Sequence, residues 1–215
     1  LGNYFREHIA EPLGADFYIG FSGVHDARTS DLFASPRPAG GTTPNIEGPL
    51  GDMMRDMNDP TTMTGAAFGN PKSIDGAHNS REWRAAEIPA ANGHGTARSL
   101  ARIYGALARG GEVDGVRILE RDSIERAIEE QVFGPDAVLG ALPMRFGLGF
   151  MLRQDMIPLG SNPRAFGHPG AGGSIGFADP DAGIGFGFVM NQMQMGLVGS
   201  AGAFAMIAVL FDALS

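Results

Sequence analysis

The chain contains no cysteine, and its acidic residues outnumber its basic ones. The lack of cysteine excludes a disulfide framework, a cysteine nucleophile and a thiolate metal site, and it leaves the redox compartment open. With 16 basic and 24 acidic residues, the formal net charge is -8. An acidic chain is a poor partner for nucleic acid or for an anionic membrane surface, so we expect neither. No two histidines stand at a zinc-ligand spacing, and we expect no metal and no cofactor.

A basic and apolar segment of the signal-peptide type is also missing from the first residues of this chain. The first residue is leucine, so any export signal would precede it and the localisation stays undetermined. Phe5, Ile9 and Leu13 follow one another in steps of four, which indicates a helix already under way at residue 1. We therefore expect this chain to be the downstream part of a longer protein.

The last apolar stretch, residues 195–211, has no charged residue over roughly the shortest length that crosses a bilayer. It contains several glycines, lacks basic flanks and is followed by Asp212. These features favour a buried C-terminal helix over a membrane span.

Residues 1–140 predict a mostly helical region with a long irregular loop over about 22–80. Prolines interrupt this loop, and loops of such length tend to be functional. Four methionines inside it indicate core filler, or else an adaptable wall of an apolar cleft. They are Met53, Met54, Met57 and Met63.

Three local signals follow the loop. A helical patch is expected over 81–91, and an amphipathic helix over 97–107 with Gly95 or Thr96 as its cap. Asp114-Gly115 is typical of a hairpin turn. Asp122 with Glu125 resembles a capping box that opens one more helix.

Residues 141–215 predict an antiparallel sheet closed by a C-terminal helix. Apolar residues alternate from 145 to 152, as in a half-buried strand, and short turns separate further strands at 165–168, 174–178 and 184–190. A final helix near 196–214 would cover one face of the sheet. The fold class is therefore α+β, an antiparallel sheet with flanking helices beside the mostly helical region, and both are parts of one truncated catalytic domain.

Ser174 lies in a match to the esterase pattern G-x-S-x-G, formed with Gly172 and Gly176. In an α/β-hydrolase this serine is lifted out of the sheet by a strand, a tight turn and a following helix. Here an alternating segment and the turn at Pro180 follow, so no helix can begin there. The pattern favours a strand residue after a glycine turn, with a nucleophile as the alternative.

His168 is the stronger candidate for chemistry, because it ends a short strand and is followed by a glycine-rich turn. Such a turn lets backbone approach a ligand closely, and its N–H groups can stabilise a developing oxyanion. His94, also between glycines, is a second candidate, although a loop position before a helix explains it as well.

Four segments of the chain, in this order, resemble the serine β-lactamase-related family, which includes class C β-lactamases and family VIII carboxylesterases. They are NYFREHIAEPLGADFYIG at 3–20, NGHGTARSLARIYGAL at 92–107, GEVDGVRIL at 111–119 and FGHPGAGGSIGFADPDAGIGFGFVM at 166–190. The resemblance implies part of a β-lactamase/penicillin-binding-protein-like fold.

The resemblance also implies a mechanism. In the family, a serine in S-x-x-K attacks an ester or lactam carbonyl, and the lysine and a tyrosine in Y-x-N share the proton transfer. A third motif, K-T-G or H-x-G, lies on a strand beside the site, and His168-Pro169-Gly170 matches its histidine form. By the same match, Ala171 would offer its N–H as one half of the oxyanion hole. A histidine is a weaker cation than lysine, and its charge depends on pH. It would therefore attract an anionic lactam less well, which favours neutral esters as substrates.

The chain departs from the family in lacking both S-x-x-K and Y-x-N. Lys72 is its only lysine, and the residue three places earlier is Gly69. In the family both motifs lie upstream of the helix at which this chain begins, so we expect them before Leu1 or on a companion chain. The leading prediction is the C-terminal part of a serine hydrolase that cleaves small-molecule esters and is inactive alone. The alternative is a non-catalytic binding or scaffold protein that keeps the fold.

A truncated sheet has a physical consequence. Without its N-terminal strands it would expose an edge and an apolar face. We therefore expect the isolated chain to hold a companion segment, to pair with a second copy, or to aggregate.

Overall fold

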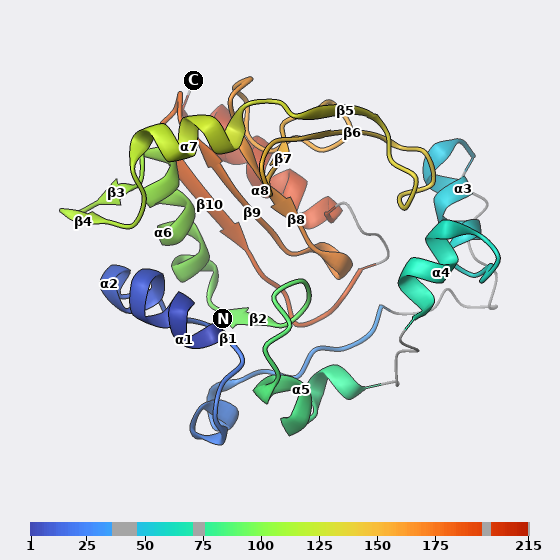
Figure 1. Cartoon of the computed structure of the whole chain (residues 1–215), viewed down its shortest axis with the longest axis horizontal. Helices are drawn as coiled ribbons and strands as arrows, with labels where there is room; N and C mark the ends of the chain where they lie inside the picture. Colours follow the sequence, from blue (N-terminus) through green and yellow to red (C-terminus); the bar gives the residue numbers. More distant parts are fainter. Residues whose placement is uncertain (36–46, 71–75, 195–198, 215) are drawn as a thin grey trace.

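The computed structural model describes residues 1–35, 47–70, 76–194 and 199–214, and Figure 1 shows a sheet flanked by helices. Among these residues, six antiparallel strands form the main sheet in the order β10-β9-β8-β7-β6-β5. The predicted α+β class with an antiparallel sheet is confirmed. The strands are β5 Val132–Pro135, β6 Pro143–Phe146, β7 Met151–Leu152, β8 Phe166–Pro169, β9 Ile175–Asp179 and β10 Ile184–Phe188.

The remaining elements surround this sheet. The predicted first helix is present, in three consecutive parts that end at Gly14 in the left-handed conformation. The predicted turn at Asp114-Gly115 joins β3 to β4, with both residues at positive φ. The helices are α1 Gly2–Phe5, a π-helical turn Arg6–Ala10, α2 Glu11–Leu13, α3 Pro49–Asp56, α4 Met63–Gly69, α5 Arg81–Ala85, α6 Ala97–Ala108, α7 Arg121–Ile128 and α8 Ala201–Asp212; the short ladders pair β1 Phe17–Ile19 with β2 Gly93–Gly95, and β3 Glu112–Val113 with β4 Val116–Arg117.

Glycine alternates with phenylalanine along β10, and this alternation decides how the sheet is covered. A Cβ on Gly185 would lie 2.0 Å from the backbone nitrogen of Gly105, so only glycine lets α6 approach this closely. Phe186 points the other way, and its ring stacks on Phe177 of β9 with 5.0 Å between centroids. Because side chains alternate along a strand, α6 covers one face of the sheet and these phenylalanines lie on the other.

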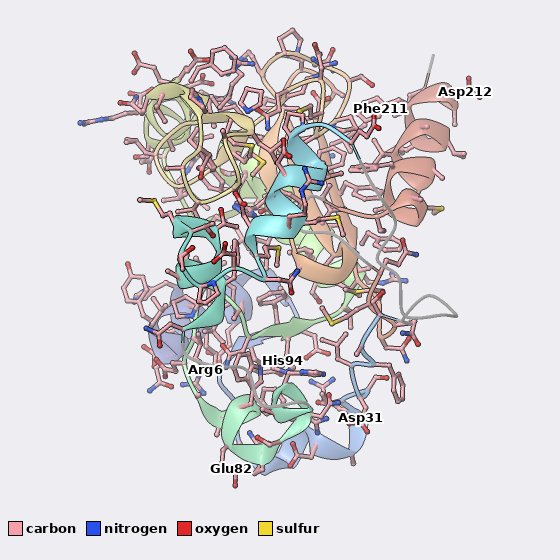
Figure 2. The ribbon with its side chains drawn as sticks, turned by 90° about the vertical axis from the view of Figure 1, so that its right-hand side faces the viewer. Arg6, Asp31, Glu82, His94, Phe211 and Asp212 are labelled. Carbon is pink, nitrogen blue, oxygen red and sulfur yellow. The ribbon has the colours of Figure 1, made fainter. Side chains whose placement is uncertain are left out.

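The face that carries Phe177 holds a large buried cluster. α8 packs onto it through Ile207, and the Phe211 ring stacks over Phe177 with 6.4 Å between centroids. Figure 2 shows α8 at one side of the molecule. The predicted final helix over one face is therefore present. It begins at Ala201, and residues 196–198 of the predicted range lie outside the described residues.

The alternating residues at 145–152 form a hairpin, so the predicted single strand is wrong. β6 and β7 pair at Phe146 and Met151, and the chain reverses between them, where Gly149 has a φ of 82°. Leu148 lies in this turn and is exposed. In this turn glycines alternate with apolar residues, so the sequence has the two-residue period of a strand although the chain reverses there.

The sheet also begins before residue 141, the predicted start of the strand region. β5 lies inside the stretch assigned to helices and loop, and it pairs with β6 over Val132 to Pro135. Half of this strand is glycine and proline, residues that are depleted in strands, so it carries no strand signal of its own.

The tract 22–80 contains more helix than predicted, because α3 and α4 lie within it. Pro49 stands in the first turn of α3, where its missing N–H has no helical partner to lose, so this proline begins a helix. Residues 36–46 and 71–75, including Lys72, lie outside the described residues.

The methionines of this tract divide into buried and exposed positions. Met53 is buried in the same core cluster as Leu142, as predicted for core filler. Met54 and Met57 are half-buried, and Met63 is exposed.

Helix ends were predicted less well than helix centres. Thr96 caps α6 as predicted. α7 begins at Arg121 with Glu120 before it, so Asp122 lies inside the first turn and does not cap the helix. α5 stops at Ala85, short of the predicted end at residue 91. No helix among the described residues combines the length and the apolar character needed to cross a bilayer.

Candidate active site

His168 lies near the end of β8, in front of a glycine-lined turn. It is the cross-strand partner of Gly176, so both residues point to the face of the sheet that α6 covers. Its side chain is exposed, and its Nδ1 lies 2.6 Å from the carbonyl oxygen of Pro169. Because a carbonyl can only accept, Nδ1 carries a proton and donates it in this contact.

The turn from Gly170 to Ser174 is closed by its own backbone. The Gly170 N–H donates to the Ser174 carbonyl at 2.6 Å, and the Gly173 N–H donates to the Gly170 carbonyl at 3.1 Å. Gly172 and Gly173 have φ values of 80° and 118°, which side-chain-bearing residues rarely adopt. Ala171 is exposed, and among the described residues its N–H donates to no backbone carbonyl. Among the described residues the turn therefore leaves the Ala171 N–H without a backbone acceptor, while the N–H groups of Gly170 and Gly173 are engaged within it.

Two further segments hold this turn, and the sequence did not identify either as part of the site. The Gln194 N–H donates to the Gly172 carbonyl at 2.8 Å, and the Met193 side chain covers Gly172. The hydroxyl of Ser200, the residue before α8, donates to the Gly173 carbonyl at 3.4 Å. A serine directly before an apolar run is a helix-cap signal, and this signal could have marked Ser200.

Ser174 does not have the setting of an esterase nucleophile. β9 follows it directly, so the strand predicted there is confirmed and the helix that a nucleophile elbow needs is absent from this described segment. The carbonyl of Ser174 closes the turn by accepting from Gly170.

His94 lies apart from His168, on β2 and opposite Tyr18 in a separate ladder, so the loop position considered for it is wrong. Its Nδ1 donates to the Asn92 carbonyl at 2.7 Å. Burial lowers the pKa of the imidazole, the Asn92 hydrogen bond opposes this, and the charges of Arg84 and Arg81 lower it further. The half-buried ring is thus biased toward its neutral form.

A surface pocket of about 290 Å³ lies away from the glycine turn, between α7, β6 and residues 163–164. Four of its charged lining residues already form ion pairs, Arg145 with Glu130 at 2.7 Å and Arg164 with Glu125. It includes none of the residues from His168 to Ala171. The candidate site therefore rests on the geometry of the turn.

Comparison with known proteins gives the family. The Beta-lactamase family model matches residues 1–209. A protein of Mycobacterium tuberculosis named Esterase/beta-lactamase LipL is 37% identical over 199 residues, which cover 90% of this chain and 43% of that protein.

Solved structures agree with this match. A family VIII carboxylesterase superposes with a TM-score of 0.82 at 36% identity and covers 98% of this chain and 51% of its own. A penicillin-binding protein homologue from Caulobacter crescentus has a TM-score of 0.77 at 34% identity, over 98% of this chain and 52% of its own. The chain thus spans about half the length of these relatives. It belongs to the beta-lactamase family, a family of hydrolases that includes esterases and β-lactamases.

Proposed function

We propose that this chain is the C-terminal part of a serine hydrolase that cleaves acyl esters through an acyl-enzyme. The observation that carries the proposal is the exposed imidazole of His168 beside a turn whose Ala171 N–H has no backbone acceptor among the described residues. The esterases among the relatives, which are about twice as long, support the reaction class.

The reaction needs a nucleophile that lies outside these residues. By family resemblance, a serine in an upstream S-x-x-K attacks the ester carbonyl carbon, and its proton passes to the lysine and the Y-x-N tyrosine. The carbonyl electron pair moves onto oxygen, where the N–H of Ala171 and that of the nucleophile would donate to it. The electron pair then re-forms the carbonyl, the ester C–O bond breaks, and the departing alkoxide takes the proton, which leaves an acyl-enzyme. Water attacks the carbonyl of this acyl-enzyme in the same way, the carboxylic acid is released, and the serine recovers its proton.

His168 would contact the substrate from beside the oxyanion pocket. With its Nδ1 proton donated to the Pro169 carbonyl, the ring would meet the substrate through Nε2. Such a ring offers no fixed positive charge to a substrate carboxylate, whereas a lysine would. This chemistry favours neutral esters over anionic lactams.

The oxyanion donor can be tested at a single N–H by Ala171→Pro. Gly170 has the extended conformation that a residue before proline requires, with φ -116° and ψ 157°, and residue 171 opens a short 3-10 helix. The variant therefore removes the N–H without breaking a backbone hydrogen bond. In enzyme assembled from this chain and an upstream segment that carries both motifs, we expect kcat for p-nitrophenyl butyrate to fall about 10²–10³-fold.

Two controls accompany this measurement. Ala171→Ser keeps the N–H and should keep the activity. His168→Ala should lower activity at least about tenfold, and the exposed His8, replaced by alanine, should leave it unchanged. Full activity in Ala171→Pro would contradict the oxyanion assignment.

A companion segment is the second part of the proposal. The outer side of α8 exposes Met206 at 56% and Val209 at 65%, and β10 is an edge strand of the described sheet. An apolar helix side and an open strand edge are surfaces that proteins normally cover. We expect co-expression with the upstream segment to yield a soluble complex, and the chain alone to aggregate or self-associate. A stable, inert monomer would count against this part.

A non-catalytic scaffold is the second candidate function, because neither S-x-x-K nor Y-x-N occurs in the 215 residues. A fluorophosphonate probe separates the candidates. Labelling of an upstream serine in the assembled protein supports the hydrolase, and no labelling at all supports the scaffold. A label on Ser174 would instead support the hypothesis that Ser174 is the nucleophile of an esterase.

A further inference from the structure

The hydroxyl of Ser200 joins two elements that meet behind the candidate site. Ser200 is 5% exposed, and its Oγ accepts from the Ala203 N–H at 3.2 Å, which caps α8. The same Oγ donates to the Gly173 carbonyl at 3.4 Å, a long hydrogen bond in a buried position. One side chain therefore fixes both the start of α8 and the second half of the glycine turn.

Packing strengthens this connection. A Cβ on Gly173 would lie 2.6 Å from the Cβ of Ser200, so the two backbones are as close as a glycine permits. Gly172 is held by the Gln194 N–H at 2.8 Å and by the Met193 side chain. Because residues 193–194 and 200 anchor neighbouring peptides, a shift of either segment would reorient the turn.

We propose that Ser200 is a positioning residue of the active site, which keeps the glycine turn in the form that aims the Ala171 N–H at the substrate oxygen. This inference rests on the proposed function. Oxyanion donors act because they are oriented before the reaction, and a misplacement of about 1 Å can cost about 10²-fold in rate. Ser200 touches no reacting atom, so its effect passes through Gly173.

Thr96 supplies a matched control. It caps α6, which has 12 residues like α8, by accepting from the Ser99 N–H. Its hydroxyl also bonds Ser99 Oγ, and among the described residues it forms no hydrogen bond with the glycine turn. Thr96→Ala therefore removes a cap of the same kind and leaves the turn unaltered.

The first experiment measures hydrogen exchange by NMR in the full chain, complexed with the upstream segment where that is needed for solubility. The amides of Gly170, Gly173 and Gln194 report on the turn, because each donates a hydrogen bond within it or to it. We expect Ser200→Ala to speed their exchange at least about tenfold more than Thr96→Ala does. Equal exchange in the two variants would overturn the proposal.

Two more variants keep the result interpretable. Ser200→Gly removes the hydroxyl but weakens a helix N-cap much less than alanine does, so it serves if Ser200→Ala does not fold. Ser200→Thr retains the hydroxyl and should restore slow exchange. Fast exchange in Ser200→Thr, equal to that of the alanine variant, would contradict the role of the hydroxyl.

Kinetics in the assembled enzyme complete the test. Ser200→Ala should lower kcat for p-nitrophenyl butyrate about tenfold with little change in KM, because the turn acts on the transition state. Unchanged kcat alongside fast exchange would show that the turn is held by Ser200 but is not catalytic, and would overturn the positioning role. If no variant turns over, the proposed function fails, and the exchange data still decide whether Ser200 holds the turn.

Discussion

The main sheet and the part of the chain around β1 and β2 are stabilised by different forces. In the sheet, apolar side chains such as Phe166 and Phe177 are fully buried. The other part, residues 16–34 and 76–95, is called here the polar corner. Figure 2 places its labelled residues Asp31 and His94 at the opposite end of the molecule from Phe211.

Ion pairs and hydrogen bonds join distant segments of the polar corner. Arg84 is 8% exposed and pairs with Asp31 at 2.8 Å, while Arg81 pairs with Asp26. Aromatic rings join them, since the His94 ring meets Phe21 edge-on with 4.9 Å between centroids. Apolar burial depends little on pH or salt, whereas ion pairs and hydrogen bonds depend on both. The sheet should therefore respond mainly to lost volume, and the polar corner to lost partners and to protonation.

The largest expected effect is that of Phe177→Ala in the sheet. The ring is fully buried and stacks on two other phenylalanines, so its removal leaves a cavity and should cost about 3–5 kcal/mol in unfolding free energy. Urea denaturation measures this loss. Phe133→Ala, at an exposed position of β5, is the control and should cost under about 1 kcal/mol. Similar losses in both variants would refute the idea that burial governs the sheet.

A smaller loss is expected for Asn92→Ala in the polar corner. Asn92 is 1% exposed, its Oδ1 accepts from the Ile88 N–H at 3.0 Å, and its Nδ2 donates to the Trp83 carbonyl at 2.9 Å. Removing it leaves buried backbone groups without partners, at about 1–3 kcal/mol. The exposed Asn58, replaced by alanine, should cost almost nothing in the same urea titration. A neutral Asn92→Ala would mean that this corner does not depend on its hydrogen bonds.

The same contrast explains what the sequence could predict. The strands at 165–168, 174–178 and 184–190 could be predicted because burial of one or both faces of a strand imposes a spacing of apolar residues that is visible in the sequence. The cap at Thr96 and the turn at Asp114-Gly115 were also local. Prediction failed at 145–152, where glycines in a turn imitated a strand.

The candidate site was predictable only in part for a related reason. His168 and the glycine turn stand together in the sequence, so their motif was visible. Ser200 and Gln194 reach the turn through contacts across at least 22 residues, and no local pattern encodes such a contact. The pairing of Arg84 with Asp31 was hidden in the same way, because the partners are separated by 53 positions. Polar contacts between distant segments leave no periodic pattern of residue types in the sequence, whereas the buried face of a helix or strand does.

The smallest expected effect, and the most specific to the polar corner, is the response of stability to pH. Burial holds the folded-state pKa of His94 below its reference value of 6.5. Below about pH 6.5 the unfolded chain therefore binds a proton that the folded chain does not, and stability falls as the pH falls. The decline ends where the folded ring is protonated too. One proton gives a slope of at most about 1.4 kcal/mol per pH unit.

His94→Gln should remove this component, and the measurement is a set of urea titrations between pH 5 and pH 8. Other groups titrate in the same range, so the informative quantity is the difference in slope between the parent and the variant. The exposed Asn58, replaced by alanine, removes no titratable group and should leave the slope unchanged. Phe177→Ala should lower the whole stability curve and keep its slope, because the ring it removes has no proton to exchange. If Phe177→Ala flattened the curve and His94→Gln did not, the assignment of pH sensitivity to the polar corner would be reversed.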